Sequence, residues 1–302
     1  MAEGFNPGRR RSSLTPAPWD KSILSPKTSR DTGRKGLTKG KFLCLITGAG
    51  NGLGRAIAGM AFQDQGILPN ALSGSKVILI DKDEDALKET SGKKMRQFLK
   101  HRKIEVELEV FDLSDVYDMK SLAEKIEDHQ ERDYEQVIFV NNASDVGDTS
   151  KTLDDYQDPD VLSKYWNLNI TSRTYLSCQF ARIFKASKRT FLHTIRMDST
   201  SPETHFGPSC MATSAVKAFT ETLAMENPKL RVLEYHVGLM ETNRTLKIVD
   251  QCGNEKVQKS AQKAQEENKL EQPLEVAKRI IKYIEGNDYT EGKVLKIIDE
   301  AY

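Results

Sequence analysis

The sequence predicts a doubly wound α/β protein, in which helices cover both faces of a parallel sheet of seven strands. Two observations lead to this fold class. Short apolar and β-branched runs alternate along the chain with longer stretches of helical period. The first of these runs also leads directly into a glycine-rich segment and then into a helical stretch. With 302 residues, 38% of them hydrophobic, the chain is long enough for one sizeable domain.

The individual elements follow in chain order. We expect strands at Phe42–Thr47, Lys76–Asp81, Ile104–Phe111, Gln136–Asn141, Thr190–Met197, Arg231–His236 and Lys293–Ile298. Apolar spacings near three and four predict covering helices at Leu53–Gln65, Glu84–His101, Val116–Gln130, Val161–Ala186, Ser209–Asn227 and Leu274–Ile284. The charged stretch Lys247–Gln272 interrupts the alternation. It is either a mobile flap over the substrate crevice or a solvated surface helix.

The N-terminal segment differs in composition from the rest of the chain. Residues 1–41 carry ten Lys and Arg against three Asp and Glu, although the net charge of the whole chain is only +1. The segment is rich in Pro, Ser and Gly and cannot bury enough apolar surface to fold alone. We therefore expect a disordered basic tail at 1–40 and one folded domain at 41–302. The tail is interpreted as a solvated extension, as a segment that directs the protein to the nucleus or is recognised by kinases, or as a weak organelle presequence.

Composition also limits the expected location and partners. The four cysteines are scattered without CxxC spacing, which favours a reduced, cytoplasmic location and predicts no metal site. No apolar stretch approaches the roughly 20 residues of a membrane span, so we expect no membrane partner. Only the charge of the tail favours nucleic acid, and we expect no nucleic-acid partner.

A phosphate-binding loop is predicted between the first strand and the first helix. The segment Thr47–Gly54 reads TGAGNGLG, follows the run Phe42–Ile46 and opens the helical stretch. Glycines allow the backbone to turn tightly and to approach a pyrophosphate, whose charge then meets free N–H groups and the positive end of a helix. Strand, glycine motif and helix together predict a Rossmann-type dinucleotide site.

Asp81, at the end of the second strand, bears on which dinucleotide binds. Its carboxylate would accept hydrogen bonds from both hydroxyls of the adenine ribose and would repel a 2′-phosphate. Asn51, in the glycine loop, offers no compensating cation. These residues favour NAD(H) over NADP(H). Lys82 could partly neutralise Asp81, and Asp81 could instead be an acid at a helix N-terminus.

These motifs resemble the short-chain dehydrogenase/reductase family over about residues 41–300. Asp112-Leu113 is similar to the family's adenine contact, and Asn141-Asn142-Ala143 to its motif after the fourth strand. Asn169 is similar to its catalytic asparagine, and Lys217 to its catalytic lysine. The resemblance implies that the dinucleotide is held by Thr47, Gly48, Asn51, Gly52, Leu53, Gly54, Asp81, Asp112, Leu113, Asn142, Ala143, Lys217, Gly238 and Thr242.

Within the family, the sequence most resembles the sepiapterin reductase group. The segments YWNLNITS at Tyr165–Ser172 and RVLEY at Arg231–Tyr235 are similar to the sequences of that group. The resemblance implies reduction of a pterin side-chain carbonyl in tetrahydrobiopterin biosynthesis, by a homodimer joined through two long helices. It also implies NADP(H), whereas Asp81 favours NAD(H).

The catalytic positions that the resemblance implies contain one departure that affects the chemistry. In the family, a tyrosine protonates the carbonyl oxygen, a serine binds that oxygen, a lysine lowers the tyrosine pKa, and an asparagine holds a water. Here Thr200 occupies the serine position, and Thr213 occupies the tyrosine position four residues before Lys217. An aliphatic alcohol is a far weaker acid than a phenol, whose pKa is near ~10, so the proton donor is missing.

Two functions therefore remain open. The first is an NAD(P)H-dependent carbonyl reductase for a pterin side chain or another small ketone or dicarbonyl, with a water or His205 as substitute proton donor. The second is a dinucleotide-binding pseudoenzyme that acts as a sensor or partner subunit. Lys296 stands where the group anchors its pterin with an aspartate, and Val237–Leu239 replaces the family's Pro-Gly-Pro. Both departures weaken the prediction of a pterin substrate.

Overall fold

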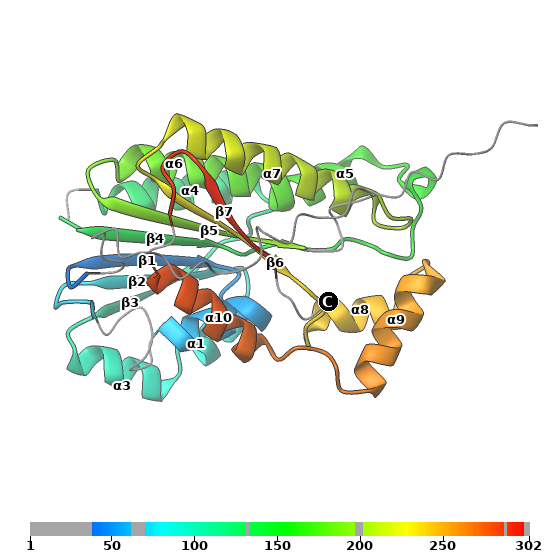
Figure 1. Cartoon of the computed structure of the whole chain (residues 1–302), viewed down its shortest axis with the longest axis horizontal. Coiled ribbons are helices and arrows are strands. Elements are labelled where there is room, and N and C mark those ends of the chain that lie inside the picture. The colour runs from blue at the N-terminus through cyan, green and yellow to red at the C-terminus, as the bar shows by residue number, and fades with distance from the viewer. Residues whose placement is uncertain (1–37, 62–69, 131–132, 197–201, 287–288, 299–302) are drawn as a thin grey trace, which may run out of the picture. The chain divides into compact units, whose positions relative to one another are not determined.

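The computed structural model describes residues 38–61, 70–130, 133–196, 202–286 and 289–298. Its seven parallel strands form one sheet in the order β3-β2-β1-β4-β5-β6-β7 (Figure 1), which confirms the predicted fold class. The strands are β1 (Phe42–Thr47), β2 (Lys76–Asp81), β3 (Glu105–Val110), β4 (Gln136–Asn141), β5 (Lys188–Arg196), β6 (Arg231–Val237) and β7 (Val294–Ile298). Every strand begins and ends within two residues of its predicted bounds; Met197, predicted to end β5, lies outside the described residues.

The order of the strands reverses at β1. This strand pairs with β2 on one side and with β4 on the other, so the two halves of the sheet extend in opposite directions from it. In open α/β sheets, the crevice beyond the carboxyl ends of the strands at such a point is where ligands bind. The fold therefore directs attention to the residues that follow β1 and β4.

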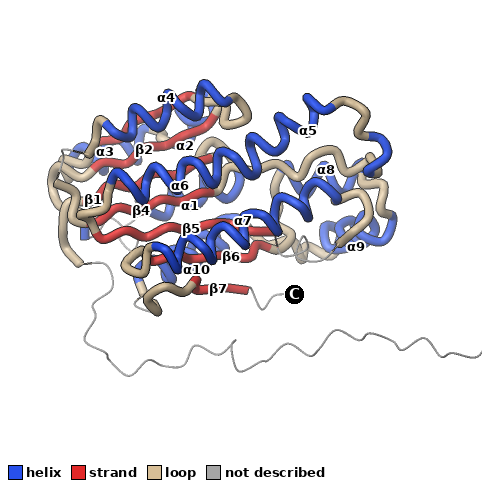
Figure 2. Tube along the Cα trace, turned by 90° about the horizontal axis from the view of Figure 1, so that it is seen from above, coloured by secondary structure: helices blue, strands red, loops and turns tan. Residues whose placement is uncertain are grey.

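Helices cover both faces of the sheet, as predicted (Figures 1 and 2). One layer consists of α4 (Val116–Glu127), α6 (Ser172–Ile183) and α7 (Gly207–Glu226). The other consists of α1 (Gly52–Ala61), α2 (Glu84–Thr90), α3 (Lys93–His101) and α10 (Pro273–Glu285). Successive side chains of a strand point to opposite faces. Phe42, Cys44 and Ile46 of β1 accordingly pack with the second layer, and Leu43 and Leu45 pack with the first.

Two of the predicted helices are divided in the structure. The predicted helix Glu84–His101 consists of α2 and α3, because the chain turns at Ser91 and Gly92. The predicted helix Val161–Ala186 consists of α5 (Pro159–Trp166), a π-helical segment (Asn167–Thr171) and α6. Such π-helical turns inside longer helices occur frequently at functional sites. This one contains Asn169.

The charged stretch before the last helix is itself helical. It contains most of α8 (Asn243–Gln251) and all of α9 (Glu255–Glu266). Together with neighbouring loops, these helices bury a small apolar cluster that consists of Val146, Phe206, Ile248, Val249, Cys252 and Ala261. The stretch is therefore helical and packed on the protein, and whether it also moves as a flap over the crevice stays a prediction.

Three residues of the expected tail, Thr38–Gly40, are described. Gln136 Nε2 donates a hydrogen bond to Thr38 O (2.6 Å), and Gly40 forms a parallel bridge with Ala71. These residues therefore contact the sheet. The remainder of the expected tail lies outside the described residues.

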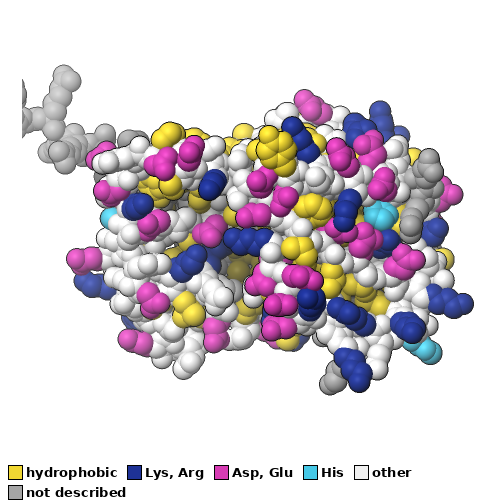
Figure 3. All heavy atoms as spheres, turned by 180° about the vertical axis from the view of Figure 1, so that it is seen from behind, with side chains coloured by type: hydrophobic (Ala, Val, Ile, Leu, Met, Phe, Trp, Pro, Cys, Tyr) yellow, Lys and Arg dark blue, Asp and Glu magenta, His cyan; other side chains and the backbone are white. Residues whose placement is uncertain are grey.

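The described surface carries charges of both signs. Acidic and basic side chains are interspersed over the face seen in Figure 3. Exposed pairs such as Lys88–Glu84 (2.8 Å) and Lys259–Glu255 (2.9 Å) contribute little to stability, because solvent screens them. In the part of the chain that the structure describes, no helix is long and apolar enough to cross a membrane.

Replacing Gly54 by alanine tests the packing of the glycine loop on α1. A Cβ at Gly54 would lie 2.0 Å from Gly48 O, so the loop must shift. We expect Gly54→Ala to lower the free energy of unfolding, measured by urea denaturation, by about 1–3 kcal/mol. Gly59→Ala is the matched control in the same helix, because its Cβ meets no atom within 4 Å; alanine there should be neutral or stabilising by up to about 1 kcal/mol. Equal stability of the two variants would contradict this packing.

Candidate active site

The glycine loop has the backbone conformation that a phosphate cradle requires. Gly48 (φ +66°) and Gly52 (φ +51°) lie in the left-handed region, which favours glycine. Gly54 has no room for a side chain, because it packs against Gly48 O. α1 begins at Gly52, so its first N–H groups, which have no intrahelical partners, are available to an anion. This loop fits the pyrophosphate of a dinucleotide.

Hydrogen bonds fasten this loop to the end of β4. Thr47 Oγ1 accepts hydrogen bonds from the N–H groups of Asn142 and Ala143, both at 3.0 Å. Asn142 Nδ2 in turn donates to Thr47 O (3.2 Å) and Gly48 O (3.4 Å). Thr47, Asn142 and Ala143 therefore hold the loop in place at the point where the strand order reverses.

Asp81 faces the glycine loop. Its Oδ2 accepts a hydrogen bond from the Gly50 N–H (2.9 Å), and a Cβ at Gly50 would lie 2.9 Å from the same oxygen. The residue that caps α2 is Asp83, whose carboxylate accepts a hydrogen bond from the Ala86 N–H (2.9 Å). Asp81 Oδ1 also accepts the N–H of Asp83 (3.2 Å), so Asp81 contacts both the glycine loop and the start of α2, while the capping side chain is that of Asp83.

The other residues expected at the dinucleotide lie around the same crevice. Asp112 follows β3; its burial raises the pKa of its carboxyl, but hydrogen bonds from Ser114 (2.8 and 2.9 Å) outweigh this and lower that pKa. Thr242 precedes α8, and a Cβ at Gly52 would lie 3.4 Å from its Cγ2. Gly238 lines a small cavity beside Thr242, whereas Leu113 and Leu53 are buried and Asn51 is exposed.

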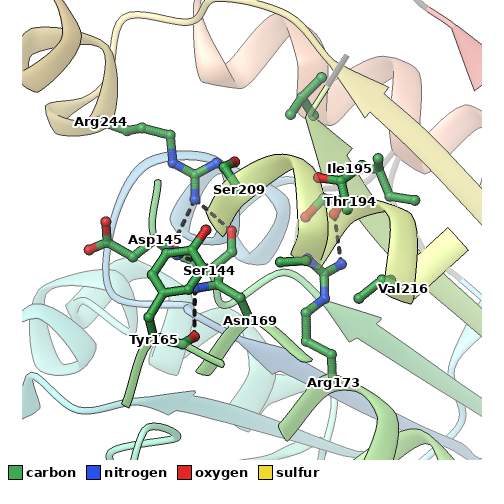
Figure 4. A pocket seen from close by; sticks show the side chains of 13 residues that line it. Ser144, Asp145, Tyr165, Asn169, Arg173, Thr194, Ile195, Ser209, Val216 and Arg244 are labelled. Carbon is green, nitrogen blue, oxygen red and sulfur yellow. Dashed lines mark hydrogen bonds between the residues drawn. The ribbon is translucent and has the colours of Figure 1, made fainter. Parts of the chain in front are cut away.

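A small pocket adjoins this crevice (Figure 4). Its lining includes Asn169 from the π-helical segment and Thr213 from α7. Asn169 is buried: its Oδ1 accepts a hydrogen bond from the Asp145 N–H, and its Nδ2 donates to Tyr165 O, both at 3.0 Å. Lys217 lies one helical turn after Thr213 and is half-buried, and its ammonium has no hydrogen-bond or ion-pair partner among the described residues. The structure thus brings the candidate catalytic residues 169 and 213 together.

The pocket also contains polar residues that sequence reasoning missed: Ser144, Asp145, Tyr165, Arg173, Thr194, Ser209 and Arg244. Thr200, the predicted carbonyl-binding hydroxyl, lies outside the described residues. Thr194 Oγ1, near the end of β5, donates a hydrogen bond to Asn142 Oδ1 (3.4 Å). Thr194 is therefore a hydroxyl that the structure does bring into the pocket.

Arg173 is the most unusual of these residues, because its guanidinium is buried. Its Nη2 donates to Asn141 O (3.1 Å) and to Thr194 O (2.6 Å), and thereby joins the ends of β4 and β5. Burial lowers the pKa of Arg173 to about 10, and the positive charge of Arg244 acts in the same direction. The one available sequence signal was its position one helical turn after Asn169.

Comparison with known proteins identifies the family. The family model of the short chain dehydrogenases matches residues 43–253. The chain belongs to the short-chain dehydrogenase family. Sepiapterin reductase from Xenopus tropicalis is 24% identical over 263 residues, which cover 86% of this chain and 97% of that protein. Two solved structures share the fold: NAD+-bound xylitol dehydrogenase, and L-sorbose reductase from Gluconobacter frateurii complexed with NADPH and L-sorbose. Each has a TM-score of 0.66 and 19% identity over 87% of this chain, and they are covered to 99% and 97%.

In this short-chain dehydrogenase, two residues considered from the sequence do not line the pocket. His205 (φ +66°) packs against the backbone of Gly253, where a Cβ would lie 2.2 Å from the imidazole ring. Lys296 of β7 pairs with Glu221 of α7. Neither residue supplies a proton or a charge to the pocket in this structure. Among the described residues, no group of three His, Cys, Asp or Glu side chains is arranged to hold a metal ion.

His193 of β5 gives the fold a predicted pH dependence. It is fully buried, neither ring nitrogen has a hydrogen-bond partner among the described residues, and burial, followed by the charge of Arg173, holds the pKa of His193 well below its ordinary value. Below about pH 6.5, His193 is therefore protonated in the unfolded chain but not in the folded chain. We expect the free energy of unfolding to fall by about 1.4 kcal/mol per pH unit as the pH decreases from about 6.5.

Urea denaturation at several pH values measures this dependence. His193→Gln should reduce the slope of the free energy of unfolding against pH by about 1.4 kcal/mol per pH unit below about pH 6.5. His101→Gln, at an exposed position, should leave that slope unchanged. An unchanged slope in His193→Gln would show that another group is responsible.

Proposed function

We propose that this protein is an NADH-dependent reductase of small carbonyl compounds whose catalysis is slowed because it lacks a tyrosine proton donor. The observation that carries the proposal is the position of the glycine loop beside the pocket that contains Asn169 and Thr213. Membership of the short-chain dehydrogenase family and similarity to sepiapterin reductase support the same activity. When bound, the dinucleotide would supply the hydride.

The preference for NADH rests on Asp81. Its carboxylate lies against the Gly50 N–H, and a 2′-phosphate placed there would meet this negative charge. NADP(H), which the resemblance to sepiapterin reductase implies, is the alternative. Both cofactors have precedents, since the xylitol dehydrogenase structure holds NAD+ and the L-sorbose reductase structure holds NADPH.

In the proposed reaction, the residues of the pocket bind the carbonyl oxygen and deliver a proton to it. Thr194 and Thr213 offer hydroxyl groups, with Thr200 as a further candidate. The Thr213 hydroxyl is too weak an acid to replace a phenol, so a water between Thr213, Lys217 and Asn169 would carry the proton. Lys217, which lies one helical turn after Thr213 but does not line the pocket, would stabilise the developing oxyanion and hold the dinucleotide.

A small ketone or dicarbonyl fits the pocket better than a pterin. The cavity offers about 30 Å³ to water-sized molecules, and one water needs roughly 10–15 Å³ on this measure. A fused two-ring pterin would need the pocket to open. A role in tetrahydrobiopterin biosynthesis stays a prediction. The homodimer and the cytoplasmic location also stay predictions.

Asp81→Asn tests the cofactor assignment by titration calorimetry with NADH and NADPH. The wild-type protein should bind NADH more tightly. The substitution removes the negative charge, so we expect the ratio of the two affinities to fall by at least about tenfold, or about 1.4 kcal/mol. Asp83→Asn is the matched control, since asparagine also caps helices and the residue does not contact the loop. Tighter binding of NADPH to the wild-type protein would contradict the assignment.

Thr213→Tyr tests the missing proton donor. We expect kcat for a small 1,2-dicarbonyl, followed by NADH absorbance, to rise by about 10²–10⁴-fold, because general acid catalysis typically contributes that much. Thr213→Phe is the control, because it adds the ring without the hydroxyl and should give no gain.

A second function is favoured by Thr213 itself, which puts an aliphatic hydroxyl where the family carries its tyrosine, four residues before Lys217. In that case the protein would be a dinucleotide-binding pseudoenzyme that acts as a sensor or partner subunit. NADH binding without turnover, in both the wild-type protein and Thr213→Tyr, would support this function over the first.

A further inference from the structure

We propose that Arg173 and Arg244 form a carboxylate-binding site in the reaction pocket, so that the substrate is a small carbonyl compound that also carries a carboxylate, such as a 2-oxo acid. This inference rests on the proposed function for the carbonyl chemistry. The binding of a carboxylate can be tested without any turnover.

The two guanidiniums reach the pocket from different elements. Figure 4 shows Arg173, from α6, directed towards Thr194, and Arg244, from α8, directed towards Ser144 on the other side. Arg244 Nη2 donates to Ser144 O (2.8 Å) and to Ser144 Oγ (2.5 Å). Both residues line the same cavity; burial lowers the pKa of Arg173, and the positive charge of Arg244 lowers it further.

Arg173 has donors left over after its contacts with the protein. One of its terminal nitrogens, Nη2, bonds to the carbonyls of Asn141 and Thr194. Its Nε is buried and has no hydrogen-bond partner, and Nη1 has none among the described residues. A buried cation with unused donors is costly unless an anion or an acceptor meets it. Guanidinium groups match the two oxygens of a carboxylate especially well.

The acidic side chains near the pocket do not pair with Arg173. Asp145 is the one acidic residue in the lining; its Oδ1 accepts the Gly147 N–H (2.8 Å), and its other oxygen lies 3.7 Å from Lys247 Nζ. Glu234, whose charge raises the pKa of Arg173, accepts the Thr220 hydroxyl at Oε1, and its buried Oε2 has no hydrogen-bond partner among the described residues. No described carboxylate forms an ion pair with Arg173. The unused donors of Arg173 are therefore open to a substrate carboxylate.

The size of the cavity agrees with the carboxylate group of such a substrate, whose remaining atoms would extend towards the crevice. Its roughly 30 Å³ corresponds to about two water molecules, and the two oxygens of a carboxylate occupy comparable room. The alternative role for Arg173 is purely structural: it would only join β4 to β5. That role alone gives no reason for the pocket to distinguish an anion from a neutral molecule of the same shape.

Titration calorimetry with unreactive probes separates these alternatives. The probes are oxamate, which carries a carboxylate, and oxamide, its neutral isostere, each titrated into the full-length protein with and without saturating NADH. We expect oxamate to bind at least about tenfold more tightly than oxamide. We also expect Arg244→Gln to remove most of this difference while the thermal unfolding transition remains cooperative. Arg173→Met should do the same if it folds, and Arg244→Gln keeps the test valid if it does not.

Arg182→Gln is the matched control, because Arg182 lies on α6 like Arg173 but pairs with Glu127 at the surface. It should leave oxamate binding unchanged. Equal binding of oxamate and oxamide, or an oxamate affinity that Arg244→Gln does not change, would overturn the proposal. Selective oxamate binding in a protein that never oxidises NADH would uphold the carboxylate site and refute the proposed reductase function, so the two failures are distinguishable.

Discussion

The site depends on the hydrogen bonds that join the end of β1 to the residues after β4. The Thr47 hydroxyl accepts two backbone N–H groups, and the Asn142 amide returns two hydrogen bonds to the glycine loop. These four bonds lie at the reversal of the strand order, where the crevice of the sheet is open. They fix the phosphate cradle relative to the pocket, because the same Asn142 also receives the hydrogen bond of Thr194 from β5.

The pocket behind this cradle is governed by a buried positive charge. Arg173 joins the ends of β4 and β5, and beside it His193 is held neutral in the core. Thr213 contributes a short hydroxyl in place of a ring, so the pocket combines strong hydrogen-bond donors with a weak acid. Such a site can polarise a carbonyl more readily than it can protonate one. Under the proposed function, dinucleotide and substrate would still bind while proton transfer is slowed.

The strands and the glycine loop could be predicted because their signals are local. Short apolar runs that alternate with helical stretches indicate the strands, which are five to nine residues long. The phosphate loop requires glycine at fixed positions, which are Gly48, Gly52 and Gly54 here. The rest of the site is assembled from distant segments: Arg244 meets Ser144 across 100 residues, and no sequence spacing announces that contact. The π-helical turn at Asn169 was also hidden, because the apolar period continues through it. Thr200, which the family resemblance implies, lies outside the described residues and stays a prediction, and Thr194 of β5 is a second hydroxyl that no sequence spacing indicated.

We propose that hydride delivery survives in this site although the family's tyrosine is absent. A single-turnover experiment tests it most directly: protein saturated with one equivalent of NADH is mixed with an excess of a small 2-oxo acid, and the absorbance of NADH is followed in a stopped-flow instrument. The account predicts slow oxidation of the whole equivalent, at a rate that increases as the pH is lowered, since solvent must supply the proton. Stable NADH, bound but never oxidised at any pH, would contradict it.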